Sequence, residues 1–319
     1  MNILYLISFL IYQVLPIFLL VRIWKNRSEN LLKWLLSTSA SAGFITYLFF
    51  IEAWAMDITG YYMRYVMLIA LFFAVIKSYL NKKRHFLKVT RRYIFTALCT
   101  STIALLSIGI VTTIILSSFQ IPKAINIDFP LKNGDYYIVH GGNSVFTNYH
   151  QEVDAQKYAL DIVKLNRFGF RCKKLNAQAV DDYNIYGDTI YSPCDGKVIE
   201  VVDGYPDLEP SIMDPDHPAG NYLTIEMPSS QTTLLLAHIQ KGSFLVKKGD
   251  SVSQGQPLCR VGNSGNTGEP HLHIHVIKTG GDLLFEGEAV PMKFNNRFLV
   301  RNDRVSSHSD SQKGERKLI

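Results

Sequence analysis

Four long apolar runs in the first 119 residues constrain the fold of this 319-residue chain more than any other feature. A helix that crosses a bilayer needs about 20 mainly apolar residues. Runs of this kind lie near residues 3–22, 34–56, 61–80 and 94–119. The first has no basic residue before it and is followed by basic residues, so we expect a retained span rather than a signal peptide. Residues 1–119 are therefore predicted to form a membrane domain with four transmembrane helices.

The basic residues between these runs predict the orientation of the chain. The first loop carries Lys25, Arg27 and Lys33, whereas the second contains Asp57 and has no Lys or Arg before Arg64. The third loop carries six basic residues: Lys82, Lys83, Arg84, Lys88, Arg91 and Arg92. Short cytoplasmic loops are enriched in Lys and Arg, so we expect loops one and three in the cytoplasm. The N-terminus and everything after residue 119 then lie outside it, and the basic clusters indicate topology rather than nucleic-acid binding.

The rest of the chain has the pattern of a separate, exported domain. Residues 120–135 are expected to be a connector, and residues 136–300 contain short alternating runs broken by Gly, Pro, Asn and Asp, which is typical of an all-β domain. We expect strands at 136–139, 157–163, 189–192, 197–203, 222–226, 232–238, 257–261 and 271–278. The polar residues 301–319 are expected to form a disordered tail. The predicted fold class is an N-terminal four-helix transmembrane region plus an all-β C-terminal domain of antiparallel sheets.

Three histidines in five residues mark the most informative segment of this second half. His271, His273 and His275 alternate with apolar residues directly after a glycine-rich turn. Residues i, i+2 and i+4 of a strand face the same way, so the three imidazoles share one face. Because such a row is costly to bury without partners and neutral imidazole suits Zn²⁺, the pattern indicates a metal or catalytic strand.

A catalytic zinc site needs about three protein ligands and one open position, so the histidine strand requires partners elsewhere. The candidates are His150, together with Asp154 or Asp161, and His238 at the end of an apolar strand. Asp161 lies within a hydrophobic run, where a carboxylate demands a partner. A salt bridge to Lys157 or Lys164 is the alternative to a metal for Asp161. The sequence contains no Cys-x-x-Cys motif. It allows a disulfide between Cys172 and Cys194 but does not establish one.

Several segments together resemble the lysostaphin/LytM-type zinc metallopeptidases, which cleave peptide cross-links or stems of bacterial peptidoglycan. Gly187 to Val198, Gly220 to Ile225, Leu236 to Ile239, Lys248 to Gln256 and Gly262 to His273 match that family's motifs in order. The last of these, ending in Pro-His-Leu-His, is highly specific. The resemblance covers about residues 140–280 and implies a lysostaphin/LytM-like fold for the exported half.

The resemblance also implies a role for each site residue. His273 would be a zinc ligand together with His150 and Asp161, and His271 and His238 would flank the water that is activated. Asp154 fits the family spacing His-x-x-x-Asp, but Asp161 in Ala-Leu-Asp-Ile better matches the family's apolar strand. We therefore choose Asp161.

One position departs from the family pattern. His275 stands where the family often has Glu, so it either supports a neighbouring side chain or faces solvent.

The resemblance implies a zinc peptidase in a bacterial cell membrane. One Zn²⁺ per chain would lower the pKa of a water toward about 7, and peptidoglycan peptides would be the substrate. The partners are then those peptides and the lipid bilayer, with no nucleic acid.

Three other functions fit parts of the pattern. The first is a catalytically inactive LytM-like domain that binds and regulates other cell-wall hydrolases. The second is a carrier or phosphotransfer domain, which needs a modifiable Lys or a cytoplasmic location. In the third, the membrane bundle is the functional unit and the β-domain is its sensor.

Overall fold

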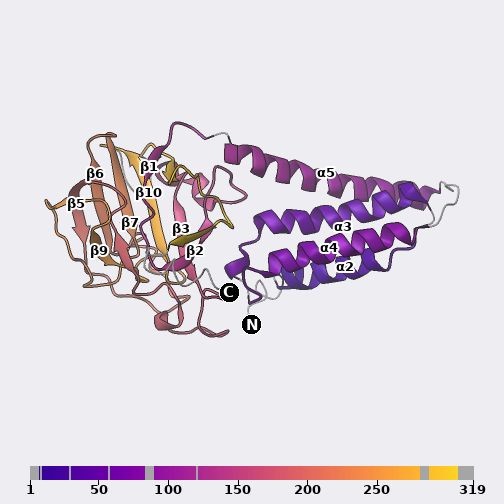
Figure 1. The fold of residues 1–319 in the computed structure, drawn as a ribbon, viewed down its shortest axis with the longest axis horizontal. Helices are drawn as coiled ribbons and strands as arrows, with labels where there is room; N and C mark the ends of the chain where they lie inside the picture. The colour runs from indigo at the N-terminus through magenta and orange to yellow at the C-terminus, as the bar shows by residue number, and fades with distance from the viewer. Residues whose placement is uncertain are drawn as a thin grey trace, which may run out of the picture. The chain divides into compact units, whose positions relative to one another are not determined.

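The computed structural model describes residues 7, 9–28, 30–56, 58–82, 90–119, 121–280 and 287–307. The chain divides into two compact units. Unit 1 comprises Met1–Trp54 and Tyr62–Leu116, and unit 2 comprises Ala55–Tyr61 and Ser117–Ile319. Unit 1 is helical and unit 2 is built mainly from strands, so the predicted fold class is confirmed (Figure 1).

Unit 1 consists of apolar helices. Its described elements are the π-helix η1 (Leu10–Val14), α2 (Leu15–Trp24), α3 (Leu31–Ile51), α4 (Met63–Leu80) and α5 (Arg91–Phe119). Three are long and apolar enough to cross a membrane, namely Leu31–Ile51, Met63–Leu80 and Tyr93–Phe119, whereas Leu10–Trp24 is shorter. The start of the predicted span 3–22 lies outside the described residues.

The outer surface of unit 1 carries many large apolar side chains. Ile45, Leu48 and Leu71 pack in its core, while Leu105 and Leu106 on α5 are 69% and 62% exposed. Large exposed apolar side chains mark a membrane or partner surface, and three of the described helices have the length and composition to cross a membrane.

The second predicted span, 34–56, is wrong at its end. Helix α3 stops at Ile51, and Glu52 leaves it with extended backbone dihedrals, φ −67° and ψ 136°. A short 3-10 helix, η2 (Trp54–Met56), follows. A carboxylate within an apolar span is costly, so the helix ends before Glu52.

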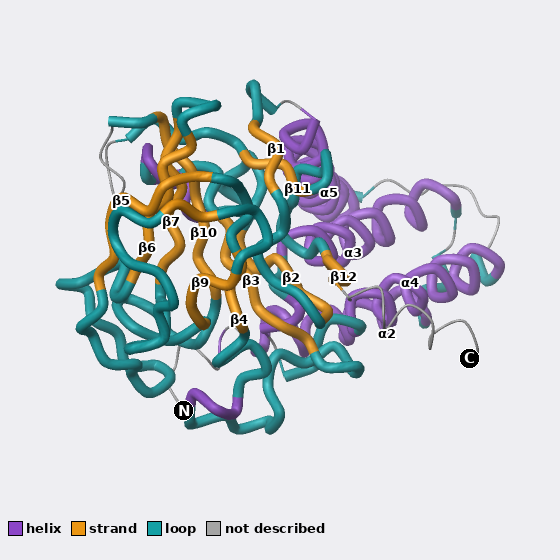
Figure 2. The backbone as a smooth tube through the Cα atoms, turned by 60° about the vertical axis from the view of Figure 1, so that its left-hand side comes forward, coloured by secondary structure: helices purple, strands orange, loops and turns teal. Residues whose placement is uncertain are grey.

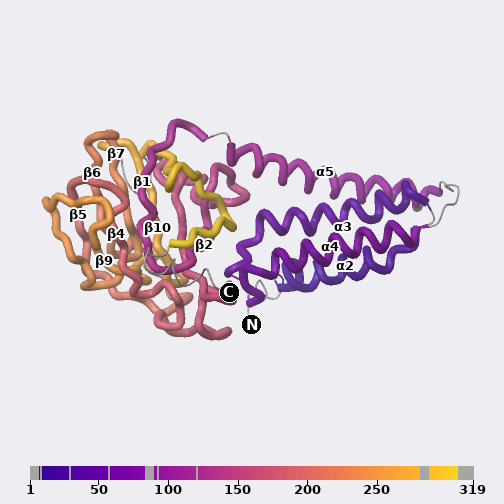
Figure 3. Tube along the Cα trace, viewed as in Figure 1, coloured from indigo at the N-terminus to yellow at the C-terminus, as the bar shows by residue number. Residues whose placement is uncertain are grey.

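Unit 2 is organised around one eight-stranded antiparallel sheet in the order β12-β2-β3-β10-β7-β6-β5-β8. Figure 2 shows its central strands in succession, and the chain trace in Figure 3 shows how distant parts of the sequence meet there. The strands are β12 (Arg304–Ser307), β2 (Gly134–His140), β3 (Leu160–Leu165), β10 (Leu272–Lys278), β7 (Thr232–Ala237), β6 (Tyr222–Met227), β5 (Gly196–Val202) and β8 (Ser251–Val252).

Two smaller sheets complete the core of unit 2. β4 (Thr189–Tyr191) pairs with β9 (Pro257–Arg260) in antiparallel fashion, and β1 (Ile125–Ile127) pairs with β11 (Met292–Phe294) in parallel. Alternate residues of the large sheet, such as Leu160, Leu236 and Ile274, enter one hydrophobic core with residues of these small sheets. The opposite residues of β3, β7 and β10 are therefore free to form a site on the other face.

The predicted disordered tail is partly wrong. Residues 304–307 form β12, which pairs with β2 at the edge of the sheet. The Arg304 guanidinium contacts the Asp135 carboxylate at 2.8 Å, and Ser306 donates to the same carboxylate at 2.5 Å. These cross-strand partners lie far away in the sequence, so local composition does not reveal the strand. Residues 308–319 lie outside the described residues.

A short segment between α3 and α4 belongs to unit 2. Tyr61 donates its backbone N–H to Gly169 at 2.9 Å, and its ring packs edge-to-face on Tyr137 with centroids 5.7 Å apart. The Arg171 guanidinium donates to the Ala55 carbonyl at 3.2 Å. Because Tyr61 and Tyr137 are both buried, Ala55–Tyr61 is a structural component of unit 2.

Candidate metal centre

The register of the large sheet brings several site residues into one row. His140 on β2 lies opposite Asp161 on β3, and Asp161 lies opposite His273 on β10. His273 in turn lies opposite Ala237, the last residue of β7. Directly opposed residues of antiparallel strands have Cβ atoms only about 5 Å apart. The sheet alone therefore places Asp161 beside His273, and His238 follows at the end of the neighbouring strand.

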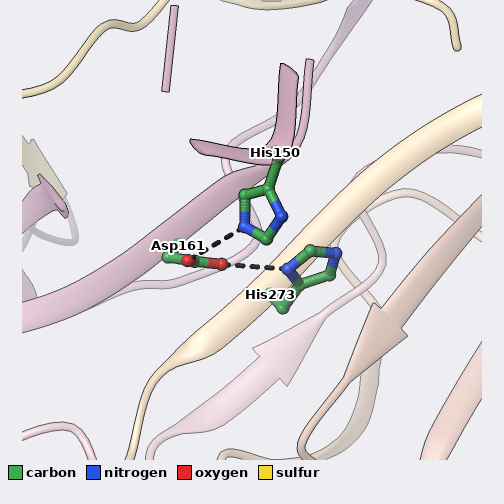
Figure 4. Close-up of side chains that lie close together, drawn as sticks. All are labelled: His150, Asp161 and His273. Carbon is green, nitrogen blue, oxygen red and sulfur yellow. Dashed lines mark hydrogen bonds and ion pairs between the residues drawn. The ribbon is translucent and has the colours of Figure 1, made fainter. Parts of the chain in front are cut away.

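Asp161 is the centre of a buried cluster (Figure 4). Its Oδ2 lies 3.0 Å from Nε2 of His150, and its Oδ1 lies 2.9 Å from Nδ1 of His273. One ligand atom from each residue can be chosen so that all three lie within 4.8 Å of one another, and all three side chains are buried. The predicted residues His150, Asp161 and His273 are thus brought together from η3 (Tyr149–Glu152), β3 and β10.

Asn148 fixes the turn that delivers His150. Its side-chain oxygen accepts from the His150 N–H at 3.2 Å and caps η3. Its amide nitrogen donates to the carbonyls of Gly142, Lys157 and Ala159 at 3.1–3.2 Å. This fully buried side chain ties the turn to the start of β3, so it fixes the position of His150 relative to Asp161.

The outer nitrogens of the two cluster histidines are both occupied. His150 Nδ1 lies 3.0 Å from the Gln156 side-chain oxygen, and His273 Nε2 lies 2.8 Å from His275 Nδ1. A side-chain carbonyl oxygen only accepts, so His150 carries its ring proton on Nδ1. Its Nε2 faces the Asp161 carboxylate. When protonated, this nitrogen donates to the carboxylate, and when deprotonated, it leaves two acceptors that a cation would bridge.

The protonation of Asp161 follows from its neighbours. Burial alone would raise the pKa of this carboxyl, but the charges of His150 and His271 and hydrogen bonds from His150 and His273 hold it well below its usual range. Burial lowers the pKa of His273, and the Asp161 carboxylate opposes that shift. The centre therefore combines an ionised carboxylate with an imidazole kept neutral by burial.

Two further histidines flank the cluster. His238 Nδ1 lies 2.9 Å from the Ser264 carbonyl, and His271 Nδ1 lies 2.9 Å from the Glu269 carbonyl. Since carbonyls only accept, each ring carries its proton on Nδ1 and presents Nε2 on its other side. The two ring centroids are 4.7 Å apart, and His271 Nε2 lies 3.6 Å from Asp161 Oδ1. Burial, followed by the charges of His271 and His273, lowers the pKa of His238 well below its usual range.

The backbone around His238 is strained and tightly supported. His238 has φ +61°, a left-handed conformation that is uncommon for a residue with a side chain. The adjacent loops meet closely, because a Cβ on Gly220 would lie 2.3 Å from the Ser264 carbonyl carbon. Asn221 donates to the carbonyls of Tyr205 and Ile239 at 2.8 and 3.0 Å. The Gly-Asn motif of the sequence thus supports His238.

A cavity of about 190 Å³ adjoins the cluster. Its polar lining includes His150, His238, His273 and His275, and its apolar lining comes from Val153, Pro218, Ala219, Leu235 and Ala237. The volume is below the ~300–1,000 Å³ of drug-sized ligand pockets. The cavity therefore places apolar side chains beside the histidines.

The other candidate residues of the sequence lie outside the His150–Asp161–His273 cluster. Asp154 is exposed and pairs with Lys157 at 2.6 Å, and Lys164 pairs with Asp188 at 2.9 Å. His217 pairs with Asp214 at 2.9 Å on an exposed loop. All four cysteines lie among the described residues and are free thiols, so Cys172 and Cys194 form no disulfide there.

Sequence reasoning missed three residues that contact the cluster. The Tyr149 hydroxyl lies 3.4 Å from Asp161 Oδ2, and its ring centroid lies 4.1 Å from that of His150. His140 packs on Tyr149 with centroids 4.4 Å apart, while the Arg301 guanidinium donates to its Nδ1 at 2.7 Å. Gln156 holds His150 as described above. The alternation of residues in β2 does not predict that His140 faces the cluster, because a β-bulge between Ile138 and His140 shifts the register of the strand.

Comparison with known proteins supports the class of protein that this site indicates. Residues 176–284 match the family described as Peptidase family M23. This stretch contains His238, His271 and His273 but begins after His150 and Asp161. The C-terminal unit therefore carries a Peptidase family M23 domain, and the resemblance drawn from the motifs is confirmed.

Two curated relatives come from Vibrio cholerae. One, named peptidoglycan DD-endopeptidase ShyB, is 41% identical over 92 residues, which cover 28% of this chain and 18% of that protein. The other, peptidoglycan DD-endopeptidase ShyA, is 37% identical over 110 residues, which cover 33% of this chain and 21% of that protein. The chain thus spans about a fifth of the length of the curated relatives it matches.

Solved structures give weaker similarities. A zinc-containing peptidase from Vibrio cholerae is 24% identical, with a TM-score of 0.30, and the match covers 57% of this chain and 39% of that one. The solution structure of lysostaphin is 16% identical with a TM-score of 0.26, covering 41% of this chain and 40% of that one.

Proposed function

We propose that this protein is a membrane-anchored zinc metallopeptidase that hydrolyses peptide bonds of bacterial peptidoglycan. The observation that carries the proposal is the buried His150–Asp161–His273 cluster with His238 and His271 beside it. The Peptidase family M23 match and the names of the two relatives support the same class of reaction and substrate.

The donor set suits zinc. Two imidazole nitrogens and one carboxylate oxygen form a His₂Asp set, and catalytic zinc sites use three such ligands with one position left open. The buried Asp161 carboxylate lies between two imidazoles at 3.0 and 2.9 Å. Nitrogen and oxygen donors of this kind, without thiolates, favour Zn²⁺ over softer metals. We assign His150, Asp161 and His273 as the ligands, and a zinc ion held there would activate water and polarise the scissile carbonyl.

His238 and His271 are the proton-transfer groups of this mechanism. Each donates Nδ1–H to a backbone carbonyl, which fixes the ring and leaves Nε2 as the reactive atom. A neutral Nε2 accepts a proton from the attacking water and, once protonated, donates one to the leaving amine or to the oxyanion. Burial depresses the pKa of His238, so its ring is unprotonated near pH 7 before the reaction.

The proposed topology puts unit 2 outside the cytoplasm. Loops one and three carry the Lys and Arg clusters, which are expected in the cytoplasm. The segment Ala55–Tyr61, which joins α3 to α4, belongs to unit 2. A loop and a domain that pack together lie in the same compartment, so this packing supports loop two and the catalytic unit being on the side where peptidoglycan lies.

The test is the full chain acting on purified peptidoglycan, with released peptides measured by mass spectrometry. His273→Ala is expected to lose both metal and hydrolysis. His271→Ala is expected to keep the metal and lose about 10²–10⁴-fold in turnover. Hydrolysis by the His273→Ala variant at the unmodified rate would overturn the proposal. A folded chain that binds peptidoglycan without cleaving it would instead indicate the inactive, regulatory alternative.

A further inference from the structure

A second cavity, of about 490 Å³, lies within unit 1. It is formed between the last turn of α2, the first turns of α3 and the start of α5. Its described lining is mostly polar: Arg22, Asn26, Ser28, Lys33, Ser37, Thr90, Tyr93, Thr96 and Thr100, with Ile23, Leu36 and Ala97. This volume lies within the ~300–1,000 Å³ range of small-molecule sites.

The walls of this cavity are held by hydrogen bonds. Asn26 donates to the Ser37 hydroxyl at 2.8 Å, and Ser28 donates to the Asn26 side-chain oxygen at 2.6 Å. These bonds tie the end of α2 to α3. On α5, the Tyr93 backbone N–H donates to the Thr90 hydroxyl at 3.2 Å. The polar lining is thus ordered on both sides of the cavity.

Among the described residues, the Tyr93 hydroxyl stands out in this lining. The Tyr93 hydroxyl is buried and has no hydrogen-bond partner among the residues that the structure describes. A buried hydroxyl without a hydrogen bond is destabilising, and no lipid tail supplies such a bond. The cavity therefore favours an occupant that carries hydrogen-bond acceptors.

The charge of the lining identifies the class of occupant. Arg22 and Lys33 are cationic, and the Lys33 ammonium lies 5.9 Å from the Tyr93 ring centroid. None of the described lining residues is acidic. The cations stand at the ends of apolar helices, and Ile23 and Leu36 are apolar. Such basic cavities between transmembrane helices suit anionic lipid headgroups.

We propose that this cavity binds the phosphodiester headgroup of an anionic bilayer lipid. Arg22 and Lys33 pair with the phosphate, and the Tyr93 hydroxyl donates to one of its oxygens. A bound lipid would bridge α5 to α2 and α3. The proposal is independent of the peptidase activity, because it requires only that these helices lie in a bilayer.

The test uses the full chain, purified in detergent and stripped of lipid, with native mass spectrometry as the readout. The probes are phosphatidylglycerol, phosphatidylcholine and inorganic phosphate. The unmodified chain is expected to retain phosphatidylglycerol in preference to phosphatidylcholine. Arg22→Gln should weaken that binding about fivefold, which corresponds to about 1 kcal/mol per cation, and Tyr93→Phe should weaken it as well.

Lys25→Gln is the matched control, because Lys25 is an exposed cation that follows α2 and does not line the cavity. It should bind phosphatidylglycerol like the unmodified chain. An equal loss in Lys25→Gln would assign the effect to surface charge and overturn the proposal. Equal retention of the two lipids, or displacement of the lipid by inorganic phosphate at the same concentration, would also overturn it.

Discussion

The Asp161 carboxylate is the residue on which the candidate centre converges. Its identity as an acidic residue inside an apolar run was visible in the sequence, as was the His271-x-His273-x-His275 alternation. The pairing of Asp161 with His273 across two strands was not, because strand register depends on contacts distant in the sequence. The contacts of Gln156, Tyr149 and His140 with the cluster could not be predicted from the sequence either, because they depend on a turn and on a β-bulge.

His275 illustrates a role that the sequence left open. It is 1% exposed, and its Nδ1 lies 2.8 Å from Nε2 of His273. A group that holds the outer nitrogen of a metal-binding imidazole orients that ligand. We expect His275→Ala to weaken zinc binding about 10–100-fold, measured by competition with a fluorescent chelator.

The control for this change is His275→Asn, which places a side-chain oxygen near the position of Nδ1 and should restore most of the affinity. Zinc binding by His275→Ala that equals the unmodified affinity would show that His275 only fills space.

His140 predicts a pH dependence of stability. Burial lowers its pKa from 6.5 to about 3, the Asp161 carboxylate opposes this shift, and Arg301 adds to it. The unfolded chain therefore takes up a proton that the folded chain excludes between about pH 6.5 and pH 3. The stability contribution is complete above pH 6.5 and falls by up to about 1.4 kcal/mol per pH unit as the pH drops through this window.

Melting temperatures of metal-free protein at pH 7, 6 and 5 measure this effect. His140→Gln, which keeps an acceptor for Arg301, is expected to melt with a shallower dependence on pH than the unmodified chain. Parallel pH profiles for the two proteins would contradict the assignment to His140.

Each predicted strand of unit 2 corresponds to an observed strand, and most bounds agree to within about one residue, with the largest differences in β2 and β3. The strand predicted at 157–163 is observed as β3, which begins three residues later than predicted, at Leu160. The Asn148 side chain binds the carbonyls of Lys157 and Ala159, which a neighbouring strand would otherwise use. His238 and His271 lie just outside β7 and β10 for a related reason, since loop carbonyls hold their rings. Alternation predicts strand interiors, whereas side-chain caps set the strand ends.

A substitution at Gly220 tests the contact between the Gly220 and Ser264 loops, which supports His238. It has φ +58°, and a Cβ there would lie 2.3 Å from Ser264 backbone atoms. We expect Gly220→Ala to destabilise unit 2 by about 2–4 kcal/mol, from backbone strain and overpacking together, and to lower its melting temperature by roughly 5–15 °C. Hydrolysis should fall as well, because Ser264 holds His238.

Gly242→Ala is the matched control, since Gly242 has φ +71° and a Cβ there would meet no atom within 4 Å. It carries the strain without the clash, so a loss of roughly 2–4 °C is expected. Equal losses in both variants would show that the close approach to Ser264 is unimportant.

At the scale of the whole molecule, unit 2 is not continuous in sequence. The span pattern predicted loop two as a short connection, but the contacts of Tyr61 with Gly169 and Tyr137 depend on residues about a hundred positions away. Arg171 links this segment to the site, because its guanidinium donates to both Ala55 and the Glu269 carboxylate. A fragment that starts at the connector therefore lacks part of unit 2.

Tyr61→Ala in the full chain tests this view. Removing a buried aromatic ring costs about 3 kcal/mol or more, so amide hydrogen exchange in β2 should accelerate on the order of a hundredfold. Tyr62→Ala, at a neighbouring residue that is 38% exposed, is the control. Unchanged exchange in β2 of the Tyr61→Ala protein would mean that loop two does not stabilise the sheet.

Zinc content of the purified full chain, measured by elemental analysis beside its Asp161→Asn and Asp154→Asn variants, tests the central claim most directly. The proposed centre predicts one zinc per chain in the unmodified protein and in Asp154→Asn, because Asp154 is exposed and pairs with Lys157. Asp161→Asn should lose the metal while remaining folded. No zinc in the folded, unmodified chain, or loss of zinc only in Asp154→Asn, would contradict the account.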